Sequence, residues 1–96
     1  MFAIIKLSIA KGKRIKVACE CWFTSESKMT PLMVKVKDED GEIRAFRNLV
    51  VLAQEKLFGG CSPSTEFLCR ITVLGQEREV VLRYKHGACT WEMILP

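Results

Sequence analysis

The sequence lacks most of the features that mark catalytic and membrane-spanning proteins. Its 96 residues contain a single histidine, and no run approaches the ~20 apolar residues that a membrane-spanning helix needs. There is no internal repeat, low-complexity tract or linker. A chain of this length is expected to form one domain, residues 1–96, with a thin core. We therefore expect a small folded domain that does not bind a membrane.

The N-terminal run, residues 1–10, is apolar, but it does not match a secretory signal. No basic residue precedes it, Lys6 interrupts it, and no small-residue cleavage site follows. An odd number of cysteines without an export signal favours free thiols in a reducing compartment. The chain has five: Cys19, Cys21, Cys61, Cys69 and Cys89. We therefore expect a cytoplasmic protein and interpret residues 1–10 as a first strand.

Apolar and polar residues alternate with period two through most of the chain, which is typical of half-buried strands. In residues 15–23 one face collects Ile15, Val17, Cys19, Cys21 and Phe23. A turn at residues 11–13 would pair this segment with residues 1–10.

A second apolar face is formed by Leu32, Val34 and Val36. A four-residue loop at 38–41 would set Val36 opposite Ile43 and Val34 opposite Ala45.

The last third of the chain predicts a three-stranded antiparallel meander over residues 66–74, 78–85 and 88–95. Two-residue turns, one within Leu74–Glu77 and one at His86–Gly87, would join these strands. This register sets Cys69 opposite Leu82, and Leu82 opposite Trp91. Leu82 should then lie in the core.

Residues 49–58 are the exception to the alternation. Side chains suited to one helix face recur with i, i+3, i+4 spacing at Leu49, Leu52, Ala53, Lys56 and Leu57. Asn48 can cap the start of a helix and Gly59 can end it, so we predict a short helix. The Val50-Val51 pair leaves a strand open as the alternative.

About six strands and one short helix predict a mostly β domain, built as a small antiparallel barrel or sandwich. In overall plan this resembles SH3-like and OB-like barrels. The resemblance implies an architecture and no function. No motif in the sequence identifies a family.

The cysteines are interpreted as core residues in preference to zinc ligands, and a small zinc or redox protein is the third hypothesis after the two binding functions below. Zinc sites usually pair their ligands as C-x2-C, whereas the nearest pairs here are Cys19-x-Cys21 and His86-x2-Cys89. Cys19, Cys21, Cys69 and Cys89 fall on predicted core faces, where free cysteine is common. No metal or cofactor is expected.

No catalytic residue can be assigned. Cys61 lies in a Gly/Ser/Pro loop with no base predicted beside it, and His86 is interpreted as an exposed turn residue. The carboxylates are scattered, so they form no acid–base pair. We predict a non-catalytic protein.

Two binding hypotheses are left. The net charge of +4 is uneven, because residues 1–37 carry eight Lys/Arg and two Glu while residues 38–96 carry seven Lys/Arg and nine Asp/Glu. Basic side chains that could contact nucleic acid or another anion are Lys11, Lys13, Arg14, Lys16, Lys35, Lys37 and Arg44.

Apolar side chains on predicted outer faces that could form a protein interface are Trp22, Met33, Phe46, Leu68 and Val81. Binding to another protein, or to a second copy, is the first hypothesis, and nucleic-acid binding by the basic N-terminal hairpin is the alternative.

Overall fold

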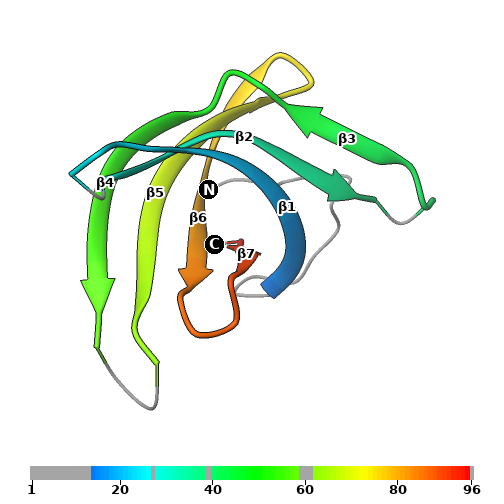
Figure 1. Ribbon diagram of the computed structural model, residues 1–96. Coiled ribbons are helices and arrows are strands. Elements are labelled where there is room, and N and C mark those ends of the chain that lie inside the picture. Colours follow the sequence, from blue (N-terminus) through cyan, green and yellow to red (C-terminus); the bar gives the residue numbers. More distant parts are fainter. Residues whose placement is uncertain (1–13, 27, 39, 59–61, 96) are drawn as a thin grey trace.

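The computed structural model describes residues 14–26, 28–38, 40–58 and 62–95. Within them the chain forms seven strands and no helix, joined as one antiparallel sheet in the order β3-β2-β1-β7-β6-β5-β4 (Figure 1). The strands are β1 (Arg14–Phe23), β2 (Met29–Lys37), β3 (Ile43–Phe46), β4 (Val50–Leu57), β5 (Ser64–Val73), β6 (Gln76–Lys85) and β7 (Thr90–Ile94). The mostly β, antiparallel prediction is confirmed. The sheet is open, however, so it is neither a closed barrel nor a sandwich. The strand and turn predicted over residues 1–13 lie outside the described residues.

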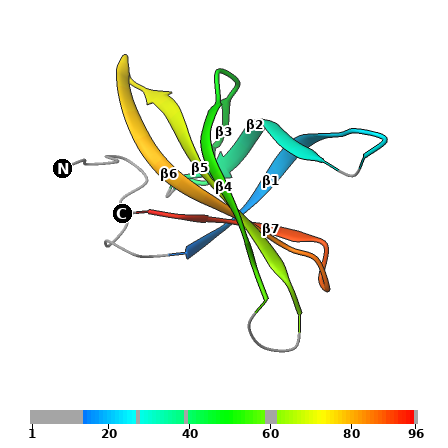
Figure 2. The ribbon, with the colours of Figure 1, turned by 90° about the vertical axis from the view of Figure 1, so that its left-hand side faces the viewer.

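The sheet curls and twists so strongly that one of its faces is enclosed by the sheet itself (Figures 1 and 2). Phe67, Leu82 and Met93, on three adjacent strands, have no exposed surface. The Phe67 ring centre lies 5.9 Å from that of Trp91. These three residues form the centre of the core because none of them is exposed. Burying a side chain of this size contributes about 1.5–3 kcal/mol to stability. Leu82 is a core residue, as predicted.

The helix predicted over residues 49–58 is wrong, because Val50–Leu57 forms strand β4. It pairs with β5 from Val50 opposite Arg70 to Leu57 opposite Ser64, with an irregularity between Val51 and Ala53. The β-branched Val50-Val51 pair favours the extended backbone. The sequence of β4 does not alternate like that of a half-buried strand, because β4 is an edge strand whose side chains are exposed on both faces.

The β5–β6 hairpin turns at Leu74-Gly75, two residues with positive φ (52° and 78°). Glycine adopts this conformation without strain, and two such residues make the tight turn that suits a twisted hairpin. Phe67 therefore lies opposite Leu82, and Cys69 lies opposite Val80 and not opposite Leu82 as predicted. This slip by two residues keeps every side chain on its predicted face.

The β6–β7 turn is longer than predicted. Lys85 pairs with Thr90, so residues 86–89 form the turn and Leu82 lies opposite Met93 instead of Trp91. The backbone N–H of Cys89 donates to the Lys85 carbonyl over 2.8 Å. Cys89 thus lies in an exposed turn and not on the core face where the sequence placed it.

The β2–β3 connection contains five residues, 38–42, and not the predicted four. Lys37 consequently pairs with Ile43, and Val34 pairs with Phe46. A shift by one residue reverses the faces of a strand. Phe46 therefore packs against the core, against the prediction that it faces outward, while Ile43 is exposed.

Two further residues predicted in the core are exposed. Between the pairs Glu20–Met33 and Cys21–Pro31 the register shifts, so Leu32 is the extra residue and is 40% exposed while Pro31 is buried. Phe23, the last residue of β1, is 56% exposed.

Candidate functional site

The open sheet has two edges, and they differ in length. The edge strand β3 has four residues, whereas β4 has eight and contains no proline. Six of the eight residues of β4 are exposed. Among the described strands only β5 pairs with β4, so its other side presents unpaired backbone N–H and C=O groups. Short strands are one way in which proteins protect an edge, and β4 is not short.

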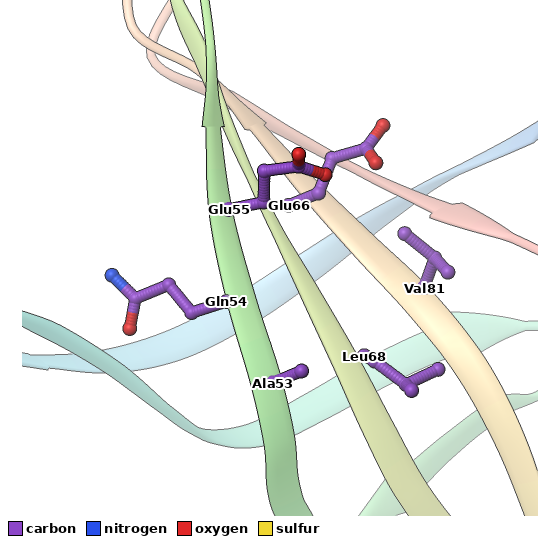
Figure 3. Close-up of a pocket in the computed structure, with 6 residues that line it drawn as sticks. All are labelled: Ala53, Gln54, Glu55, Glu66, Leu68 and Val81. Atoms are coloured by element: carbon purple, nitrogen blue, oxygen red, sulfur yellow. The ribbon is translucent and has the colours of Figure 1, made fainter.

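A shallow cavity of about 350 Å³ adjoins this edge (Figure 3). Six residues line it: Ala53, Gln54, Glu55, Glu66, Leu68 and Val81. Leu68 alternates along β5 with the buried Phe67 and Cys69, so the cavity lies on the face opposite the core. Ala53 pairs with Leu68, and Leu68 pairs with Val81, so the cavity has an apolar floor that spans three strands.

The rim of the cavity is acidic. Glu55 lies directly opposite Glu66 across the β4–β5 pair, and Figure 3 shows the two side chains next to each other. Glu66 accepts a hydrogen bond from Nε of Arg83 over 2.8 Å and also contacts Nη2 of that arginine. Within the described part of the chain Glu55 forms no ion pair. One carboxylate at the β4 edge thus lacks a compensating charge.

The five apolar residues predicted to form an interface do not come together. Leu68 and Val81 lie side by side at the cavity. Met33 is half-buried on β2, and Trp22 is 61% exposed near the end of β1. Phe46 faces the core, as described above.

The predicted basic residues separate into three groups. Arg14 and Lys16 on β1, and Lys35 and Lys37 on β2, are exposed on the outer face, where Lys35 lies opposite Ala18. Arg44 is not free, because its Nε donates to Oδ2 of Asp38 over 2.8 Å. Lys11 and Lys13 lie outside the described residues.

The described cysteines are free thiols that differ in burial. Cys69 is buried, and Cys19 and Cys21 are partly buried. Burial and the neighbouring thiols of Cys21 and Cys69 raise the pKa of Cys19 to about 12, and burial raises the pKa of Cys69 to about 12. These two thiols are protonated at neutral pH and are therefore poor nucleophiles. Cys61 lies outside the described residues.

His86 is an exposed turn residue, as predicted, but it has a partner. Its Nε2 lies 2.8 Å from Oγ1 of the buried Thr65, and its ring meets that of Tyr84 edge-on at 4.9 Å between centres. The contact satisfies a buried hydroxyl and holds the β6–β7 turn against the start of β5. Nowhere in the described ranges do three His, Cys, Asp or Glu side chains gather in a way that could hold a metal ion.

The β4 edge is not predicted from the sequence, because the spacing in residues 49–58 favours a helix. The Val50-Val51 pair is the one signal in the sequence that could locate it.

In the part of the chain that the structure describes, no helix is long and apolar enough to cross a membrane. Comparison with known protein families, with curated proteins and with solved structures finds no match.

Proposed function

We propose that this chain is a non-catalytic binding domain that receives an extended segment of another protein along the free edge of β4. The observation that carries the proposal is the combination of an eight-residue edge, which no described strand other than β5 pairs, with an apolar cavity beside it. An added strand gains affinity from main-chain hydrogen bonds, and pockets for alternate side chains supply selectivity. A cytoplasmic location stays a prediction from the cysteines.

The arrangement of the edge supports a strand as the ligand. From Ala53 to Leu57 the pairing of β4 with β5 is regular, so the backbone on the free side is also regular over these residues. Val50 is 49% exposed and Ala53 and Glu55 are exposed, so side chains of an added strand would meet surface that the fold leaves open. The opposite edge, β3, ends after four residues and offers little backbone to pair with.

Hydrogen exchange with a strand-forming probe tests this function. The probe is designed to add antiparallel, as the described strands of the sheet do. It is a nine-residue peptide of alternating threonine and valine with a central leucine and with a lysine two positions before that leucine. We expect it to slow amide exchange within Val50–Leu57, because backbone amides on a free edge exchange readily until they are paired. The same peptide N-methylated on alternate residues, on the side that would face β4, removes those donors and is the control.

Slower exchange confined to β3, or no change in β4 at saturating peptide, would contradict the proposal. A second copy is the other occupant to be tested. Light scattering that finds a dimer, with β4 amides already protected in the absence of peptide, would also contradict it.

A second candidate function is supported by the basic outer face of β1 and β2. Arg14, Lys16, Lys35 and Lys37 are exposed there, and the exposed Trp22 lies on the same face of β1. Cationic grooves with aromatic side chains bind single-stranded nucleic acid by phosphate contacts and base stacking.

For this second candidate, changing all four cations to Glu should lower affinity for a single-stranded oligonucleotide by more than about tenfold, because the phosphate contacts become repulsive. Four contacts also predict that log affinity falls with log salt with a slope of about −3 in the parent. Anisotropy of a fluorescent oligonucleotide measures both quantities. Lys56→Glu, on β4, is the control for charge reversal elsewhere. A parent that fails to bind at low salt excludes this function.

A further inference from the structure

We infer that the segment received by β4 carries an apolar residue and, two positions away, a lysine or arginine. The inference rests on the proposed function and specifies its ligand. Two parallel rows of side chains cross the outer face of the sheet and end at the free edge of β4. Each row indicates what the next strand should present.

The first row is apolar. It runs from Ile94 on β7 through Val81 and Leu68 to Ala53 on β4, each residue paired with the next. Three of these residues line the cavity at its β4 end. A strand added to β4 would place a side chain opposite Ala53, where an apolar group extends the row and covers the cavity floor.

The second row is charged and alternates in sign until its last member. Lys16 lies opposite Glu92, Glu92 opposite Arg83, and Arg83 opposite Glu66. Glu55 then repeats the negative charge of Glu66 at the edge. Like charges directly opposite are unfavourable in a sheet, and opposite charges are favourable. The position across the free edge from Glu55 therefore suits a cation.

The two rows fix the spacing of the ligand. Ala53 and Glu55 are two residues apart on one face of β4, so their partners on an added strand are also two residues apart on that face. A second copy that pairs antiparallel through its own β4, with the outer faces of the two sheets continuous, does not supply this pattern. Its only basic residue in β4, Lys56, lies opposite the buried Thr65 and so belongs to the other face. The charges therefore favour a different protein as the partner.

A charge exchange between the peptide and Glu55 tests the inference. Two fluorescent peptides are compared, the probe described above and the same peptide with glutamate in place of lysine. The parent should bind the lysine peptide about fivefold more tightly, the effect of one exposed ion pair. Glu55→Lys should reverse the preference, and Glu55→Gln should remove it. High salt should reduce the preference in the parent.

The control is Glu20→Lys, which makes the same change of charge at an exposed site on β1, in the part of the sheet beyond β7. It should keep the preference of the parent. Circular dichroism confirms that each variant is folded, and Glu55→Gln provides the test if lysine is not tolerated. If the parent binds both peptides equally, the inference is wrong while the edge-binding function stands. If the parent binds neither peptide, both are wrong.

Discussion

Replacing Leu82 with alanine should lower the free energy of unfolding by ~2–5 kcal/mol, the range observed when a buried leucine is truncated. Leu82 has no exposed surface and lies in β6 between Phe67 on β5 and Met93 on β7. The loss combines the removed apolar contacts with the cavity that remains. A domain has about 5–15 kcal/mol of stability in total, so this substitution is expected to remove a large part of it.

Urea denaturation of the parent and the variant measures the difference. Val81→Ala is the matched control, because Val81 immediately precedes Leu82 in β6 but is only half-buried on the outer face. Its loss should be clearly smaller. Equal losses for the two variants would show that the two faces of β6 are not assigned correctly.

The sequence predicted the core better than it predicted strand pairing. Both C-terminal turns were misplaced, yet the partners of Leu82 changed only by two positions, from Cys69 to Phe67 and from Trp91 to Met93. A slip of two preserves the face of every residue, because side chains alternate with period two. The buried set on β5 and β6 could therefore be predicted from alternation even though the register could not.

The β2–β3 pair shows the opposite case. One additional loop residue moved Phe46 from the predicted outer face to the core and left Ile43 exposed. Loop length decides this outcome, and residues 38–42 contain no sequence signal that distinguishes four loop residues from five. The hydrogen bonds that close the longer loop converge on Asp38, through its carboxylate and through backbone bonds with Gly41 and Glu42, and only the structure reveals them.

The candidate site could not be predicted for a related reason. Edge strands lose the clean alternation that identifies strands, because both of their faces meet solvent. On β4, Gln54 and Lys56 point to the side that holds the core on neighbouring strands, yet they are exposed. The opposition of Glu55 and Glu66 depends on pairing between strands whose register the sequence left unassigned. Leu68 and Val81 were predicted on the outer face, but their common role at one cavity required the structure.

Asp38 is expected to hold the β2–β3 register, so Asp38→Ala should lower the urea midpoint at neutral pH. Its side chain is only 3% exposed, and Oδ1 accepts the backbone N–H groups of Asp40 and Glu42, each over 2.9 Å. Oδ2 accepts from Arg44. Removing the carboxylate leaves these donors without their acceptor in a loop that sets which face of β3 meets the core.

The effect should depend on pH in a definite direction. The hydrogen bond from the Arg44 guanidinium, aided by the two backbone N–H groups, lowers the pKa of Asp38 below the ordinary value of an aspartate. The folded state thus binds a proton at Asp38 less readily than the unfolded state does. Its contribution to stability is complete above the ordinary pKa and is lost as pH falls through the lowered one. The difference between parent and Asp38→Ala should therefore be largest at neutral pH and shrink in acid.

Urea midpoints measured from neutral to strongly acidic pH provide the test. Asp38→Asn should fall between the parent and Asp38→Ala, since its amide oxygen can still accept the two backbone N–H groups but lacks the charge that pairs with Arg44. Asp40→Ala removes an exposed carboxylate from the same loop and should change the midpoint least. A parent-to-Asp38→Ala difference that stays constant as Asp38 titrates would show that its charge does not stabilise the loop. The register of β3, and with it the inward position of Phe46, would then need another cause.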